Sequence, residues 1–200
     1  MKIEQSEISG SKAPDRAGIY LVDGELTVSR SMIANNMGGG VEVANNMKFT
    51  IMNSFIVGNV TRGGLNIINP RVGSVLRCNT IVDNISGNTA LDAGGVLCNN
   101  AAFTFSDSLI YRNAAGPNGF QQTVGACVFS GSYVSPNDMA DPNVLNFAKD
   151  TVPRDYHLTS ASPALVKNVA TAVCTGLVDY DGDPRPSGGA CDLGADEVKE

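Results

Sequence analysis

The sequence lacks several patterns on which whole classes of function depend. It has no tryptophan, one histidine and 6% aromatic residues, and its 14 lysines and arginines form no cluster. Nucleic acids and anionic membranes are bound through clustered basic residues, so neither is an expected partner of this chain of net charge -6. No apolar run approaches the ~20 residues of a membrane-spanning helix. Residues 1–6 hold no apolar signal region, so we expect neither a secretion signal nor membrane insertion in the chain as given.

Two further absences concern the cysteines and the histidine. None of the five cysteines belongs to a Cys-x-x-Cys pair, which argues against a zinc site or a thioredoxin-type motif. A cysteine nucleophile needs a nearby base, and His157 is the only histidine in the chain. We therefore predict no catalytic residue, and we expect His157 to make a hydrogen bond within the tail.

Glycine and asparagine are abundant instead, with 22 and 19 residues, and they mark a repeat of about 25 residues. Each unit ends in an asparagine: Asn36, Asn59, Asn84 and Asn113. Each unit also has a glycine that precedes a short apolar segment: Gly18, Gly40, Gly64 and Gly95. No unit contains the ten or more residues of 3.6-residue periodicity that a crossover helix needs. The repeat therefore predicts short strands separated by tight turns.

A right-handed parallel β-helix of about 5–6 coils, with a loop-rich C-terminal cap, accounts for this repeat. Stacked coils place equivalent residues above one another, and they bury a core that no single coil could bury. One predicted interior ladder is Val28, Ile51, Leu76 and Phe105, and a second is Ile33, Ile56, Ile81 and Ile110. The asparagines fit tight corners, since asparagine tolerates left-handed backbone angles and its amide can bond the next coil.

The pattern divides the chain into coils over residues 1–138 and a capping or anchor-type module over residues 139–200. Residues 3–10 align with residues 28–35, so the chain begins in the middle of a coil. A solenoid needs a cap at each end. We expect either that a longer protein precedes this end or that another molecule covers it, and that the tail folds over the last coil.

Three segments of the tail resemble a known module. They are residues 155–165 (DYHLTSASPAL), 181–186 (DGDPRP) and 188–197 (GGACDLGADE). Together they are similar to the C-terminal module of bacterial right-handed parallel β-helix repeat proteins of the choice-of-anchor Q type. The resemblance covers the last 50 residues or so, and it implies a secreted or surface-attached bacterial protein. Some relatives of that kind are polysaccharide lyases or glycosidases.

The five cysteines suggest disulfides. Cys174 and Cys191 bracket the Asp-rich loop of the tail, and a bridge between them would stabilise the fold by ~3 kcal/mol. Cys98 and Cys127 occupy similar positions on adjacent coils, where a bridge and two unbonded core thiols are both open. Cys78 is left over, and we interpret it as an inert core cysteine.

Asp179, Asp181 and Asp183 alternate along the loop, as in sites where carboxylates converge on calcium. Position twelve from Asp179 is Ala190 rather than glutamate, so the loop is not an EF-hand. An Asp/Gly/Pro turn without an ion is the competing interpretation. Calcium is thus the one cofactor that the sequence suggests.

The sequence favours a non-enzymatic stalk, adhesin or self-assembling unit whose partners are other copies end to end, or extracellular glycan or matrix. Polysaccharide lyases and glycosidases need paired or clustered acids, and the outward columns of the predicted coils hold scattered ones. The alternative is a fragment of a carbohydrate-active β-helix enzyme, or a carbohydrate-binding module.

Overall fold

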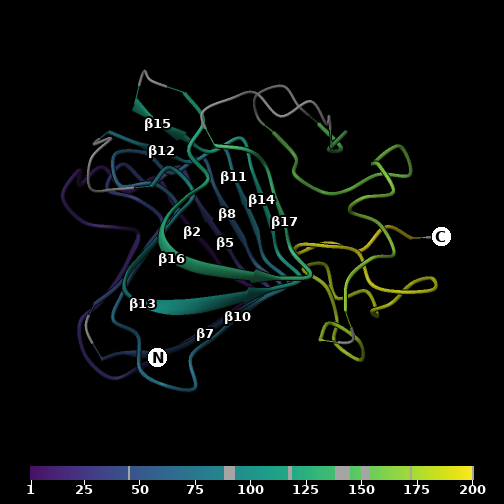
Figure 1. The fold of residues 1–200 in the computed structure, drawn as a ribbon, viewed down its shortest axis with the longest axis horizontal. Helices are drawn as coiled ribbons and strands as arrows, with labels where there is room; N and C mark the ends of the chain where they lie inside the picture. The colour runs from purple at the N-terminus through teal and green to yellow at the C-terminus, as the bar shows by residue number, and fades with distance from the viewer. Residues whose placement is uncertain are drawn as a thin grey trace.

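The computed structural model describes residues 1–44, 46–87, 93–116, 119–137, 145–149, 154–171 and 173–199. Its strands form a parallel β-solenoid of about five turns (Figure 1), and the described residues contain no α-helix. The predicted all-β fold class is therefore confirmed. The predicted boundary between residues 138 and 139 lies outside the described residues.

The turns stack their strands into two large sheets. The six-stranded second sheet contains β2 (Glu7–Ser9), β5 (Met32–Ala34), β8 (Phe55–Val57), β11 (Thr80–Val82), β14 (Leu109–Tyr111) and β17 (Tyr133–Val134). One arm of the nine-stranded sheet contains β1 (Lys2–Glu4), β4 (Glu25–Ser29), β7 (Lys48–Met52) and β10 (Val75–Arg77). The other arm contains β3 (Ile19–Leu21), β6 (Val41–Val43) and β9 (Leu65–Ile68).

The long strand β13 (Val96–Ser106) joins these two arms, because its first residues pair with β9 and its last residues with β10. Strand β16 (Thr123–Ser130) pairs with β13 along both parts. A separate two-stranded pair is formed by β12 (Ile85–Ser86) and β15 (Ala114–Ala115). Every strand pair in the sheets is parallel, so each turn repeats the course of the turn before it.

The register confirms both predicted interior ladders. Val28 pairs with Ile51, Ile51 with Leu76, and Leu76 with Phe105. The second sheet aligns the four isoleucines of the second predicted ladder in the same way, from Ile33 to Ile110. All of these side chains are at most 1% exposed, and they form the centre of the core between the sheets. The alignment of residues 3–10 with the second turn is also confirmed, since Ile3 pairs with Val28 and Ile8 with Ile33.

The buried asparagines form a continuous ladder parallel to the solenoid axis. The Asn36 Nδ2 donates to Asn59 Oδ1 at 3.0 Å, and the same bond joins Asn59 to Asn84 and Asn84 to Asn113 at 2.9 Å. Gln122 Oε1 accepts the last of these bonds, from Asn113. Each amide therefore satisfies its neighbour inside a core that would otherwise penalise it.

Two columns of left-handed residues flank the second sheet. The first corner column precedes its strands and consists of Gln5, Arg30, Asn53, Cys78 and Asp107, with φ between 48° and 53°. The second corner column follows the strands and consists of Gly10, Asn35, Gly58, Asp83 and Arg112. Positive φ is uncommon outside glycine, so these corners are tight turns that direct side chains away from the core.

The described part of the tail packs along the outside of the second sheet (Figure 1). The strands of this sheet carry apolar side chains on both faces, and the outer ones include Phe55, Val57 and Leu109. Tail residues such as Phe147, Val166 and Leu193 cover them and complete a second hydrophobic cluster. The described part of the tail thus covers the side of the solenoid across several turns, and the cap over the last coil stays a prediction.

Candidate functional site

The first corner column holds the tail. Asn53 Nδ2 donates to the Val178 carbonyl at 2.6 Å, and Asp107 accepts from the Thr171 backbone N–H at 2.9 Å and from its hydroxyl at 2.7 Å. Between them in the column, Cys78 is bonded to Cys174. Consecutive turns thus each contribute one anchor to the same stretch of tail.

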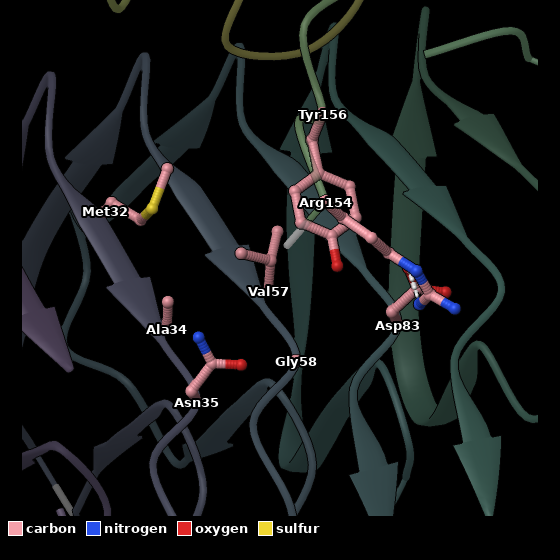
Figure 2. Close-up of a pocket in the computed structure, with 8 residues that line it drawn as sticks. All are labelled: Met32, Ala34, Asn35, Val57, Gly58, Asp83, Arg154 and Tyr156. Carbon is pink, nitrogen blue, oxygen red and sulfur yellow. Dashed lines mark hydrogen bonds and ion pairs between the residues drawn. The ribbon is translucent and has the colours of Figure 1, made fainter. Parts of the chain in front are cut away.

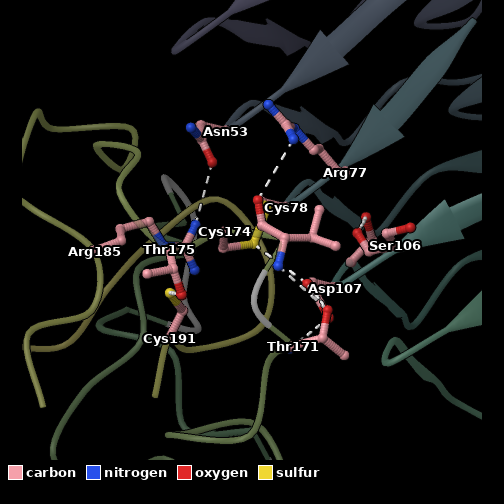
Figure 3. Close-up of a disulfide and its surroundings, with 12 residues drawn as sticks. Asn53, Arg77, Cys78, Ser106, Asp107, Thr171, Cys174, Thr175, Arg185 and Cys191 are labelled. Atoms are coloured by element: carbon pink, nitrogen blue, oxygen red, sulfur yellow. Dashed lines mark hydrogen bonds between the residues drawn. A yellow bond between two sulfur atoms is a disulfide. The ribbon is translucent and has the colours of Figure 1, made fainter. Parts of the chain in front are cut away.

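The disulfide pattern corrects two of the predictions from sequence (Figure 3). Cys174 pairs with Cys78 rather than with Cys191, and Cys191 is a buried free thiol. Cys78 is therefore not an inert core cysteine. Its left-handed corner turns the side chain outward to the tail, where Cys174 lies. Of the two alternatives left open for Cys98 and Cys127, the structure has the disulfide.

The motifs that carry the family resemblance form a buried polar network. Arg185 and Glu197 have side chains 0% and 1% exposed, and Arg185 Nε donates to Glu197 Oε2 at 3.0 Å. Arg185 Nη1 also donates to the Gly194 carbonyl at 2.9 Å. The same nitrogen donates to Asn53 Oδ1 at 3.2 Å (Figure 3). The Asp192 carbonyl accepts from Nη2. These residues therefore tie the two motif segments to each other and to the third turn of the solenoid.

The three aspartates suggested as calcium ligands have separate partners. Asp179 is buried, and its Oδ1 accepts the backbone N–H groups of Gly182 and Asp183, which closes the turn. Asp183 pairs with Lys199 at 2.9 Å. Asp181 Oδ2 lies 3.3 Å from His157 Nε2. Within the described part of the chain, the ligand atoms of the three acids do not form one cluster. Calcium binding itself stays a prediction.

A pocket of about 240 Å³ opens between the tail and the second sheet (Figure 2). Its floor is apolar, and its wall is polar. The floor consists of Met32, Ala34 and Val57, and the wall of Asn35, Gly58, Asp83, Arg154 and Tyr156. The wall thus combines part of the second corner column with two tail residues.

Asp83 forms ion pairs with two arginines at the wall of this pocket. Arg112 donates two hydrogen bonds to the Asp83 carboxylate, at 3.0 and 2.9 Å. Arg154 Nη1 lies 2.5 Å from Asp83 Oδ2 (Figure 2). Burial, together with the negative charge of Asp83, raises the pKa of Tyr156 to about 12, while Arg154 opposes the rise. Tyr156 is therefore a neutral hydrogen-bonding group at physiological pH.

Sequence reasoning missed this pocket, although one signal for it was present. Strands β5, β8 and β14 are apolar at every position, which is typical of strands buried on both faces. That pattern indicates a cover over the outer face, and the second corner column lies at the edge of the covered area. The predicted hydrogen bond of His157 within the tail is confirmed, and its partner is Asp155.

Comparisons with known proteins identify no relative. A scan against protein-family models, a search of curated proteins and a search of solved structures each found no match.

The compartment is indicated by the cysteines. Two disulfides are typical of proteins in oxidising compartments, so they point away from the cytoplasm. Among the described residues, no helix has the length and apolar character needed to cross a membrane.

Proposed function

We propose that the chain is a non-enzymatic β-helix module of a secreted or surface-attached bacterial protein, and that it holds a sugar residue of an extracellular glycan in the pocket of Figure 2. The two disulfides and the resemblance of the tail support the extracellular setting. The observation that carries the binding role is the pocket itself, because its wall and floor offer the two kinds of contact that a sugar needs.

A sugar ring presents apolar C–H faces and a rim of hydroxyl groups. The Tyr156 ring and the apolar floor suit the ring faces, while the Asn35 amide, the Asp83 carboxylate and the Arg154 guanidinium suit the hydroxyls. Pockets for drug-sized ligands measure ~300–1,000 Å³, so about 240 Å³ fits one ring of this kind. Asp83 is already oriented by Arg112, which lowers the entropic cost of binding.

The test is titration of the purified chain with a panel of neutral and acidic polysaccharides and their monosaccharides. Asn35→Gly removes the amide while glycine accepts the φ of 55° at this corner. Arg154→Met removes the guanidinium and keeps a long apolar stem. We expect each change to weaken binding about tenfold, which corresponds to ~1.4 kcal/mol.

The matched control is Arg71→Met, since Arg71 pairs with Glu25 on the exposed surface and does not line the pocket. It should leave affinity unchanged. The proposal would be overturned if all three variants bound a sugar as tightly as the unchanged chain. It would also be overturned if no sugar of the panel bound. New unsaturated or reducing ends in the incubated polysaccharides would support the carbohydrate-active enzyme instead.

End-to-end assembly is a second candidate, because both ends of the solenoid carry edge strands over half-buried apolar side chains. Among the described strands, β1 and β2 pair on one side only, and so do β16 and β17 at the other end. Ile3 and Ile8 at one end, and Phe129 and Val134 at the other, are partly buried against the core. Edge strands with unpaired backbone groups can be extended by another chain.

Light scattering across a concentration range tests this second candidate. If copies stack, the mass rises with concentration, and Ile8→Lys suppresses the rise by placing a charge in the joint. Glu7→Lys is the control, because Glu7 lies on the same strand and is exposed. A mass that stays at one chain at every concentration argues against stacking.

A further inference from the structure

A group of potential metal ligands lies in the tail, apart from the pocket of Figure 2. One ligand atom each from His157, Asp181 and Asp196 lies within 4.8 Å of the other two. His157 Nε2 is buried and has no hydrogen-bond partner among the residues that the structure describes, although Asp181 Oδ2 is 3.3 Å away. A buried ring nitrogen without a partner is costly, so it calls for an explanation.

The surroundings of His157 orient this nitrogen toward the two carboxylates. Its Nδ1 contacts Asp155, and its backbone N–H donates to the same carboxylate at 3.1 Å. The Phe55 ring lies edge-on to the imidazole and the Tyr180 ring is tilted against it, with centroids 5.2 and 5.8 Å away. A carboxylate on one ring nitrogen leaves the other as the lone-pair donor, which is the arrangement found behind metal-bound histidines.

Of the two carboxylates, Asp196 is held in place by the fold and Asp181 is open to solvent. Asp196 is 5% exposed, and its Oδ2 accepts the Leu158 backbone N–H at 2.7 Å. Asp181 has a side chain 52% exposed, so it leaves a route for an ion from solvent. Both acids and His157 line one hollow of the surface, together with Asp183 and Glu197.

The ligand set distinguishes between ions. Calcium takes six to eight oxygen ligands, whereas zinc and similar first-row ions accept one imidazole and two carboxylates. Two ligands at about 2.0–2.2 Å from a tetrahedral ion lie roughly 3.3–3.6 Å apart. The distance of 3.3 Å between His157 Nε2 and Asp181 Oδ2 falls in that range. One neutral imidazole and two carboxylates also balance the charge of a divalent ion.

We propose that His157, Asp181 and Asp196 bind one divalent first-row transition ion, with zinc as the representative, and that Asp155 positions the imidazole. This site differs from the calcium loop that the sequence suggests, because Asp179 and Asp183 are not ligands in it. It is also independent of glycan binding. Three protein ligands leave at least one coordination position for water or for a donor atom of another molecule.

The test uses the whole chain, freed of metal with a chelator and titrated with zinc chloride by calorimetry. We expect one ion per chain, and cobalt(II) in place of zinc should give the visible absorption of a low-coordinate complex. Asp181→Asn should weaken zinc binding at least tenfold, and this half-exposed residue can be changed without disturbing the fold. Asp155→Asn should weaken it 10–100-fold through loss of imidazole orientation.

Asp15→Asn is the matched control, since Asp15 is an exposed aspartate in the loop before β3. It should bind zinc as the unchanged chain does. Equal zinc uptake in all of these proteins would show surface binding and overturn the site. So would no zinc binding at all, in which case His157 is an imidazolium paired with the two acids. Calcium binding that survives His157→Gln would also overturn it, in favour of an all-oxygen site.

Discussion

Arg185 is the residue on which the tail network converges. Its guanidinium bonds a carboxylate, a side-chain amide and two backbone carbonyls, and the side chains of Arg185 and Glu197 are at most 1% exposed. Such a pair stabilises a fold only while both partners are present, because a lone buried charge has lost its hydration. The two motif segments of the tail therefore depend on each other through one ion pair.

Replacing Arg185 with methionine should destabilise the protein by about 3–5 kcal/mol, since Glu197 is left buried without its partner. Urea unfolding measures the change. Arg71→Met removes an arginine from an exposed pair and should cost at most about 1 kcal/mol. Equal losses in the two variants would show that the Arg185 network contributes no more than a surface pair. Adding Glu197→Gln to Arg185→Met should restore part of the stability.

The raised pKa of Tyr156 predicts that this tyrosine ionises late in an alkaline titration of the protein. Ordinary tyrosines ionise near pH 10, whereas burial raises the pKa of Tyr156 to about 12. The stabilisation from neutral Tyr156 is thus complete below about pH 10 and is lost as the pH rises through about 12. Absorbance of tyrosinate should show this step in the native chain and not in Tyr156→Phe. A titration that Tyr156→Phe leaves unchanged would contradict the assignment.

At the scale of the repeated elements, the glycine of each repeat packs against an asparagine of the ladder. A Cβ at Gly64 would lie 2.8 Å from Asn84 Nδ2 and 2.9 Å from the Gly95 carbonyl oxygen. Gly40 and Gly95 meet the next asparagine in the same way. The glycines of the repeat therefore allow the third strand of each turn to lie directly on the asparagine ladder.

Gly64→Ala should cost about 1–3 kcal/mol, because the added methyl group has backbone and a fixed amide as its neighbours. Gly189→Ala is the control, since a Cβ there meets nothing within 4 Å. Thermal unfolding of the two variants against the unchanged chain is the measurement. If Gly64→Ala were as stable as Gly189→Ala, the turns could move apart without loss of stability, which would contradict the prediction.

The solenoid elements could be predicted from sequence because stacking repeats the same requirement in every turn. Val28, Ile51 and Leu76 occupy equivalent positions in successive turns, so their spacing in the sequence indicates the register of the strands. The tail has no such repetition, and its partners are far apart in the chain: Asn53 meets Arg185, and Cys78 meets Cys174. Cys174 and Cys191 are close in sequence, so sequence alone favours that local pairing over the distant one that the structure has. The ligand group around His157 depends on the same tail folding, which local spacing does not encode.

At the scale of the whole molecule, the disulfide between Cys78 and Cys174 joins the fourth turn to the tail across 96 positions. In the loop-entropy description a loop of about 100 residues gives ~4.7 kcal/mol of stabilisation. Cys174→Ser should lose much of this in urea unfolding, and limited proteolysis should then cut the tail first. Cys191→Ser should have little effect. A large loss in Cys191→Ser, or two or more reactive thiols per chain in the denatured, unreduced protein, would contradict the observed pairing.

The same disulfide determines how the molecule responds to tension. A force applied between Met1 and Lys199 is transmitted through the covalent chain up to Cys78, across the sulfur–sulfur bond, and on from Cys174. The turns that lie between those two cysteines in sequence are outside this route, so stretching cannot unravel them while the bond is intact. A stalk built in this way would lengthen only by its first turns and its last segment. Reduction of the bond between Cys78 and Cys174 would then expose the rest of the chain to the load, except the stretch between Cys98 and Cys127, which the second disulfide closes.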